Sequence, residues 1–291
     1  MTDPFPTVDP TVDPTVDPTA QDPVPDTQWS PISGPLAAQQ LGNPLAPNVV
    51  FLHGFTQTGN SWKPIAEQIA GAGYHVVVID LPGHGGSAGV RADLRRTADM
   101  VATLGGVATY VGYSLGGRVA LHLALMYPHL TRFTVLIGAH AGIADDDERA
   151  RRREADDAVE ARLNELGVEA FVREWVTQPL FGDLVTTEAE IADRCRNTVA
   201  GLASSLRLAG TGAQTALWPR LHEVQAPVLA MAGARDEKFA ALAEQIATAV
   251  GHGRALVVPN ADHAAHLQQA EFVVQTLLTL LPPPRLELID S

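Results

Sequence analysis

The sequence of 291 residues has a single cysteine, Cys195, no long hydrophobic run and few positive charges. One thiol cannot form an internal disulfide, which is typical of proteins in a reducing compartment. No run reaches the roughly 18 apolar residues of a membrane-spanning helix, and no basic stretch followed by an apolar segment suggests a secretory signal. These absences predict a cytoplasmic protein without a membrane span.

Lysine and arginine total 20 against 33 aspartates and glutamates, which gives a formal net charge of −13. This charge would repel a phosphate backbone, so nucleic acid is not expected as a partner. Part of the charge lies in residues 1–28, where TVDP occurs three times in succession without any Lys or Arg. Regular proline opposes helix formation and the tract has almost no core-forming residues, which predicts an acidic, disordered tail.

Short β-branched runs begin after this tail and alternate with helical patterns. Runs that are apolar without alternation are typical of strands buried on both faces. Such runs occur at 48–54, 75–80, 108–114, 132–138, 226–233 and 254–260, and helical patterns occur at 62–71, 94–104, 117–127, 237–250 and 271–281. This alternation predicts an α/β fold with a doubly wound, mostly parallel sheet. A short hairpin around 36–42 is expected at one edge.

One long segment interrupts the alternation. Residues 144–222 show helical periodicity and no strand pattern, and 145–167 are dense in charge, as in a solvated helix. We therefore expect a helical lid inserted between two strands of the sheet. The predicted organisation is a tail at 1–28, a core formed by 29–143 and 223–282, the lid at 144–222 and a C-terminal tail at 283–291.

A serine lies between small residues where a predicted strand ends and a helix begins. Gly112, Ser114 and Gly116 match the G-x-S-x-G pattern of a nucleophile elbow, a tight turn that exposes the serine hydroxyl at the helix N-terminus. A pattern of five residues also arises by chance. Its position between strand and helix favours the catalytic interpretation.

A serine hydroxyl is a weak nucleophile and a weak base unless a histidine accepts its proton. In a fold of this kind an acid and then a histidine follow the serine, each after a later strand. Asp236 and His263 occupy those places and predict a Ser114–His263–Asp236 triad. Asp236 also suits an N-cap of the following helix. Asp262 and His266 are competitors, and His266 is expected to begin the final helix or to line the pocket.

A developing oxyanion needs backbone donors aimed at it. The expected donors are the amides of Phe55 and Leu115, although an ordinary turn would also explain His53 and Gly54. A loose G-x-G-x-x-A match at 83–88 does not open a helix directly, and no acid follows on the next strand, so no dinucleotide site is expected. No metal-binding motif occurs, and neither a metal nor another cofactor is expected.

The chain contains, in this order, LHGF, DLPGHGGS, GYSLGGR, GARDEKF and ADHAAH, and it resembles the α/β-hydrolase superfamily over residues 45–281. It is most similar to the 2-succinyl-6-hydroxy-2,4-cyclohexadiene-1-carboxylate synthase family of menaquinone biosynthesis. The motifs that carry this resemblance are GYSLGGR, WVTQPLF at 175–181, SLR…GTG.Q…LW at 205–218 and D.KF at 236–239. The resemblance implies a triad that acts as a general base: it removes a proton α to a carbonyl, and pyruvate leaves.

The substrate of that family carries several carboxylates, so the resemblance also implies cationic side chains in the pocket, preferably arginines for bidentate contacts. Arg118 follows the serine on the same predicted helix, and Arg152 and Arg194 match arginines that the family uses. Solvated helix arginines are an equally good interpretation of the last two. The other residues expected to line the pocket are Trp175, Phe181 and His140.

Three hypotheses remain open. The first is a carbon–oxygen lyase that eliminates pyruvate from a polycarboxylate intermediate. The second is a serine-triad hydrolase, either a carboxylesterase or a carbon–carbon bond hydrolase, with Ser114 as covalent nucleophile or His263 activating water. The third is a non-catalytic binding protein, against which an intact triad argues. Fold alone does not decide among them. A small anionic substrate and a monomer or weak homo-oligomer are expected.

Overall fold

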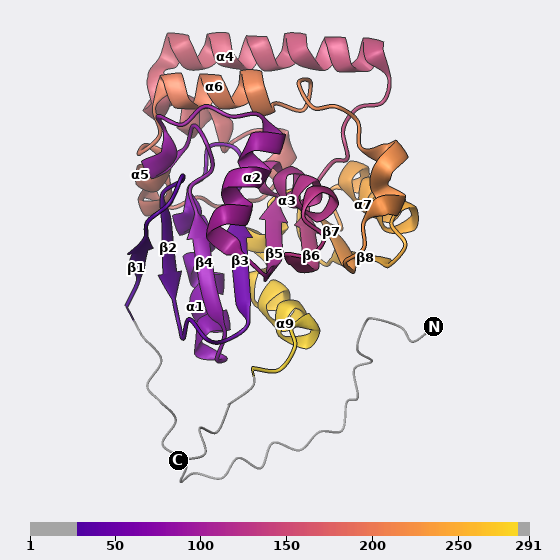
Figure 1. Ribbon diagram of the computed structural model, residues 1–291. Helices are drawn as coiled ribbons and strands as arrows, with labels where there is room; N and C mark the ends of the chain where they lie inside the picture. Colours follow the sequence, from indigo (N-terminus) through magenta and orange to yellow (C-terminus); the bar gives the residue numbers. More distant parts are fainter. Residues whose placement is uncertain (1–27, 285–291) are drawn as a thin grey trace, which may run out of the picture.

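The central feature of the computed structural model, which describes residues 28–284, is one eight-stranded sheet (Figure 1). Its strands are β1 (Ser30–Ile32), β2 (Ala38–Leu41), β3 (Asn48–Leu52), β4 (His75–Ile79), β5 (Ala108–Tyr113), β6 (Thr131–Ile137), β7 (Val228–Gly233) and β8 (Gly253–Val258). The order across the sheet is β1-β2-β4-β3-β5-β6-β7-β8. Strands β3 to β8 are parallel, and β1 and β2 form an antiparallel hairpin at one edge. The predicted α/β fold is confirmed. The predicted tails fall almost entirely outside the described residues.

Helices cover both faces of the sheet, and this explains the apolar runs without alternation. Along β3, Val50 and Leu52 belong to one core, while Val49 and Phe51 belong to the other, because successive side chains of a strand point to opposite faces. The first core is closed by α2 (Leu94–Gly105), α3 (Leu115–Met126) and α7 (Glu237–Ala249), and the second by α1 (Lys63–Gly71) and α9 (Ala270–Leu280).

The edge strand β8 departs from the prediction of burial on both faces. It pairs only with β7, and most of its residues are partly exposed, with Val257 at 45%. An apolar run therefore does not distinguish a central parallel strand from an edge strand, since the number of neighbouring strands is a property of the whole sheet.

The segment 144–222 between β6 and β7 is helical and contains no strand. It comprises α4 (Asp146–Trp175), η3 (Pro179–Phe181), α5 (Glu188–Arg194), α6 (Val199–Ala209) and η4 (Trp218–Glu223). Figure 1 shows α4 and α6 stacked beyond the carboxyl ends of the central strands. Leu163 and Phe171 of α4 pack against Leu202 and Ala203 of α6 in a small core of their own. We call this segment the insertion.

The charged helix predicted at 145–167 is longer in the structure and is interrupted. Asp145 caps it by accepting a hydrogen bond from the Glu148 amide at 2.7 Å. The helix breaks at Gly167, where φ is 72° and ψ is 173°, and then continues to Trp175. Glycine tolerates this conformation without a steric penalty, so the charged helix ends at Gly167 and a second helical piece follows it to Trp175.

The remaining helices of the described chain are short: η1 (Gly59–Trp62), η2 (Gly85–Ser87) and α8 (Ala265–Gln268). Within residues 28–284, no helix combines the length and the apolar composition needed to cross a bilayer.

Helix α3 packs unusually close to the sheet at its first turn. A Cβ atom added to Gly116 would lie 2.1 Å from the backbone oxygen of Leu52, and one added to Gly112 would lie 2.3 Å from that of Gly116. Real Cβ atoms do not approach backbone oxygens at such distances, so both positions require glycine for this approach.

We predict that Gly116→Ala lowers the free energy of unfolding by at least about 2 kcal/mol, because the methyl group forces α3 away from β3. Gly71→Ala is the matched control: Gly71 ends α1, and no atom lies within 4 Å of an added Cβ there. That change should be neutral or stabilising by up to about 1 kcal/mol. Urea unfolding measures both, and equal effects would contradict the packing argument.

Candidate active site

Ser114 occupies the turn between β5 and α3 with a strained backbone. Its φ is 49° and its ψ is −104°, a region that residues other than glycine seldom adopt. The amide of Ser114 donates to the carbonyl of Ile137 at 2.8 Å, which ties the turn to the neighbouring strand β6. The side chain of Ser114 lines a cavity at the carboxyl end of the sheet.

Ser114, His263 and Asp236 form a hydrogen-bonded chain. Ser114 Oγ lies 3.3 Å from His263 Nε2, and His263 Nδ1 lies 2.8 Å from Asp236 Oδ2. When the Nδ1 proton is donated to the carboxylate, Nε2 is left as an acceptor for the serine hydroxyl. The three residues follow β5, β8 and β7, and they meet because parallel strands end at one edge of the sheet.

Asp236 makes both of the contacts that its two interpretations require. Its Oδ1 atom accepts a hydrogen bond from the Phe239 amide at 3.3 Å and caps α7, while Oδ2 accepts from His263. The cap holds the carboxylate in the orientation that the histidine requires.

The two competitors are engaged elsewhere. Asp262 accepts from Gln268 Nε2 at 2.9 Å, and one of its oxygens lies 3.6 Å from Arg235. His266 lies in α8, just before the final helix, with its ring centroid 4.2 Å from that of Tyr113 and 4.5 Å from that of Trp62. Its complete burial lowers its pKa. It does not line the cavity at Ser114.

The cavity at Ser114 and His263 has a volume of about 240 Å³ and lies between the sheet and the insertion. Most of the charged side chains that line it are cationic. They are Arg118, Arg152 and Lys238, and the lining contains one acid, Asp156. The larger apolar side chains around it are those of Phe55, Leu115, Ile143, Val159, Trp175, Leu180, Leu206 and Phe239. A site of this composition suits a small anion with an apolar body.

Arg118 is a buried cation whose hydrogen-bond acceptors within the described chain are neutral. Its Nη1 atom donates to the carbonyl of Ala209 at 2.7 Å and lies 3.4 Å from Gln214 Oε1. Burial, together with the nearby charge of Arg152, lowers the pKa of Arg118 to about 10, so it remains charged at neutral pH. Arg152, in contrast, is half-exposed and pairs with Asp156 at 2.8 Å.

Phe55 and Leu115, the two predicted amide donors, line the same cavity. Leu115 is the first residue of α3, where backbone N–H groups have no acceptor within the helix. Phe55 lies in the loop after β3, and the His53 carbonyl of this loop accepts from the Gly116 amide of α3 at 3.0 Å. The two amides therefore belong to two segments that are in contact at the start of α3.

His53, one residue before the Gly54–Phe55 peptide, orients that peptide. The Gly54 carbonyl accepts from His53 Nδ1 at 2.8 Å and from the Gln57 amide at 3.1 Å. In a trans peptide the carbonyl and the N–H point in opposite directions, so these bonds also set the direction of the Phe55 N–H. His53 Nε2 accepts from the Leu81 amide at 2.9 Å, which requires a neutral ring. Burial lowers the pKa of His53 to about 4.

Of the other predicted pocket residues, only some line the cavity. Trp175 and His140 line the cavity, and desolvation of His140 lowers its pKa to about 4. Phe181 is buried behind them, with its ring centroid 6.2 Å from that of Trp175 and 6.5 Å from that of His263. Arg194 does not line the cavity. Its Nη1 atom donates to Thr56 Oγ1 at 2.6 Å instead, so the expected pocket position of Arg194 is wrong.

Several lining residues were not predicted. Lys238 belongs to the DEKF motif at 236–239. Its position two residues after Asp236 could have indicated that it lies near the site. Ile143, Val159 and Leu180 lie within or beside the insertion, and nothing local marks them because helix packing decides which side chains face the cavity. Within the described part of the chain, no group of three or more His, Cys, Asp or Glu side chains is placed to hold a metal ion.

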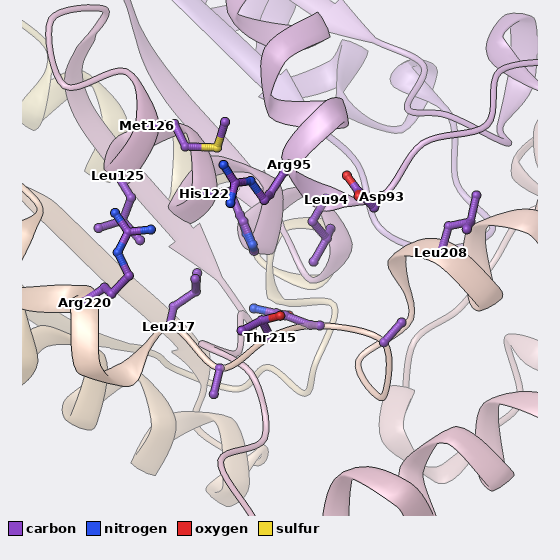
Figure 2. Close-up of a pocket in the computed structure, with 13 residues that line it drawn as sticks. Asp93, Leu94, Arg95, His122, Leu125, Met126, Leu208, Thr215, Leu217 and Arg220 are labelled. Carbon is purple, nitrogen blue, oxygen red and sulfur yellow. The ribbon is translucent and has the colours of Figure 1, made fainter. Parts of the chain in front are cut away.

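A second cavity of about 190 Å³ lies beside the later turns of α3 and does not include Ser114. Figure 2 shows His122 and Arg95 reaching into it from above, with Leu217 and Thr215 below. Gln214 also lines it. Two of these residues contact Arg118: Gln214 at the guanidinium and His122 at the backbone carbonyl. Arg118 and Gln214 therefore lie between the two cavities.

Comparison with known proteins agrees with this geometry. The alpha/beta hydrolase family model matches residues 49–276. The chain belongs to the α/β-hydrolase family. It is 36% identical over 258 residues to the 2-succinyl-6-hydroxy-2,4-cyclohexadiene-1-carboxylate synthase of Salmonella paratyphi C, across 84% of this chain and 98% of that protein. The resemblance found in the motifs is confirmed, and the chain is an enzyme of the α/β-hydrolase fold.

Solved structures give the same result. MenH from S. aureus superposes with a TM-score of 0.76 at 30% identity, across 81% of this chain and 93% of that one. A thermophilic esterase from Thermogutta terrifontis shares the fold, with a TM-score of 0.69 at 22% identity, across 86% of this chain and 97% of the esterase.

We predict that acid destabilises this enzyme through buried neutral histidines. Burial lowers the pKa of His53 to about 4 and that of His84 to about 3, from an ordinary value of 6.5. Below pH 6.5 the unfolded chain binds protons that the folded chain does not, so the free energy of unfolding falls as pH falls toward 4. The expected loss between pH 6.5 and 5 is roughly 2 kcal/mol for each of these histidines.

Urea unfolding at pH 7 and pH 5 measures this loss. In His53→Asn the side-chain amide cannot titrate, so the decrease between the two pH values should be smaller than in the unaltered enzyme by about 2 kcal/mol. An identical pH dependence in both proteins would show that His53 is not a buried neutral group.

Proposed function

We propose that this enzyme is a carbon–oxygen lyase of menaquinone biosynthesis that eliminates pyruvate from a polycarboxylated cyclohexene intermediate and forms 2-succinyl-6-hydroxy-2,4-cyclohexadiene-1-carboxylate. The observation that carries the proposal is the hydrogen-bonded Ser114–His263–Asp236 chain inside a cavity whose charged lining is mostly cationic. The names of the most similar relatives support the choice of reaction.

In the proposed mechanism the triad is a general base. His263 Nε2 accepts the Ser114 proton as the serine oxygen removes the proton α to a carbonyl of the substrate. Asp236 stabilises the imidazolium that forms and keeps the ring in the productive tautomer. The electron pair released at the α carbon forms the new ring double bond as the carbon–oxygen bond breaks. Ser114 keeps the proton taken from the substrate, and His263 passes its extra proton to the departing pyruvate enolate, which restores the neutral imidazole.

Charge develops on the carbonyl oxygen as the α proton leaves. The amides of Phe55 and Leu115 are the proposed donors for this oxygen, and the contacts of Gly54 with His53 and Gln57 support a fixed orientation of the first. Fixed donors that need no reorganisation during the reaction stabilise such charge far better than water does.

The substrate carboxylates need cations, and the overall acidity of the chain makes local placement essential. Arg118 is the proposed principal partner, since its acceptors within the described chain are neutral and a carboxylate would complete its hydrogen bonding. Arg152 and Lys238 are the proposed secondary partners, with Trp175 and His140 around the apolar ring. In this proposal residues 144–222 act as a lid over a core formed by 29–143 and 223–282.

The second candidate is a serine hydrolase, because the Ser114–His263 contact at 3.3 Å also suits nucleophilic attack on an ester. A hydrolase would accumulate an acyl-enzyme and release product in a burst. A neutral ester gives Arg118 no partner, and this favours the lyase.

We predict that Ser114→Ala lowers the rate of pyruvate release from the authentic intermediate by at least about 1000-fold, because the substrate proton loses its acceptor. A lactate-dehydrogenase-coupled assay measures this rate. In the unaltered enzyme, turnover of p-nitrophenyl acetate should be much slower than pyruvate release. Fast ester turnover with a burst and without pyruvate release would establish the hydrolase instead.

We predict that Arg118→Met lowers kcat/KM for the anionic intermediate by about 10- to 100-fold, the value of one or two charge-assisted hydrogen bonds. Hydrolysis of a neutral nitrophenyl ester by the same variant should change less than about threefold. Arg207→Met is the control, because Arg207 pairs with Glu160 away from the cavity. Equal losses on both substrates would argue against carboxylate binding by Arg118.

A further inference from the structure

The residue after Phe55 has a backbone conformation that its own side chain disfavours. Thr56 has a φ of 68° and is completely buried. For a β-branched residue this left-handed conformation is an outlier that persists only where surrounding contacts impose it, at a cost of order 1–3 kcal/mol. The contacts around Thr56 therefore identify what holds the Phe55 segment in place.

Two residues of the insertion supply those contacts. Arg194 Nη1 donates to Thr56 Oγ1 at 2.6 Å, and Asn197 Nδ2 donates to the Thr56 carbonyl at 2.7 Å. Both side chains are buried, Arg194 with 6% and Asn197 with 4% of its surface exposed. The side chain and the carbonyl of Thr56 are thus held at once, which restrains both of its backbone dihedrals.

The same short stretch of the insertion also forms hydrogen bonds with the rest of the loop that follows β3. Asp193 accepts from Thr58 Oγ1 and from Asn60 Nδ2, each at 2.6 Å. Asn197 Oδ1 accepts from the Gly85 amide at 2.8 Å, which joins the neighbouring loop of the core. The end of α5 and its connection to α6 therefore join the insertion to two loops of the core.

The insertion holds Phe55 from a second side as well. The Phe55 ring centroid lies 5.2 Å from that of Trp175 and 6.5 Å from that of Phe171, and both of these residues belong to α4. Phe55 is thus enclosed between aromatic rings of α4 and a backbone neighbour fixed by Arg194 and Asn197.

We propose that Arg194 and Asn197 are positioning residues that hold the Phe55 amide in place through the strained Thr56, so that the insertion completes the oxyanion site. Neither residue lines the cavity, and neither touches the reacting atoms. This inference rests on the proposed role of the Phe55 amide. It gives Arg194 a function other than the carboxylate binding expected from the sequence.

A double-mutant cycle separates the two roles of Arg194. Arg194→Met removes the bond to Thr56 Oγ1 and should lower kcat about 10- to 100-fold, with KM changed less than about twofold, since a misplaced donor affects the transition state. Thr56→Gly removes both the hydroxyl and the steric cost of the positive φ. In the Thr56→Gly background, Arg194→Met should therefore change kcat less than about threefold.

The opposite result would overturn the proposal: an undiminished effect of Arg194→Met in the Thr56→Gly background means that Arg194 acts directly on the substrate. Asn197→Asp provides a second test, since it keeps the acceptor for Gly85 but cannot donate to Thr56. It should lower kcat with KM retained, and an unchanged kcat in a folded protein would also refute the proposal.

Arg173→Met is the matched control, because Arg173 pairs with Glu169 and Glu188 within the insertion and makes no contact with the loop. It should leave kcat unchanged. The measurements are made with the full chain on the pyruvate-releasing reaction and on p-nitrophenyl acetate. An oxyanion forms in either reaction, so an enzyme that only hydrolyses the ester would disprove the proposed function and still report on Arg194 and Asn197.

Discussion

The close approach of helix α3 to strand β3 is the constraint on which the site depends. Without side chains at Gly112 and Gly116, the helix begins directly above the sheet, and the chain must turn from β5 into α3 within one residue. Ser114 takes up this turn in a strained conformation. The strain is compensated by the packing of α3 between the core and the insertion, since a strained residue persists only when its surroundings determine it.

The same edge of the sheet collects the other polar groups, because every parallel strand ends there. Asp236 and His263 follow the last two strands, and each is fixed by bonds that also define local structure, as in the cap that Asp236 makes for α7. Burial keeps His53 and His84 neutral, whereas Arg118 stays charged at neutral pH despite its burial. The cavity thus combines a proton acceptor with cations at short range in an acidic protein.

The insertion covers the cavity and also contributes to its structure in two ways. It supplies Arg152 and Trp175 to the cavity wall, and through Arg194 and Asn197 it holds a strained residue of the core. Core and insertion are therefore structurally interdependent at the loop after β3.

The sequence by itself determined the elements that local chemistry encodes. The alternation of apolar runs with helical patterns led to the sheet, and the glycines around Ser114 marked the turn, because these signals depend on neighbours in the chain. Tertiary structure decided the rest. Arg152 and Arg194 look equivalent in the sequence, yet Arg152 lines the cavity and Arg194 contacts Thr56. The edge exposure of β8 and the strain at Thr56 likewise arise from contacts between distant segments, which no local pattern records.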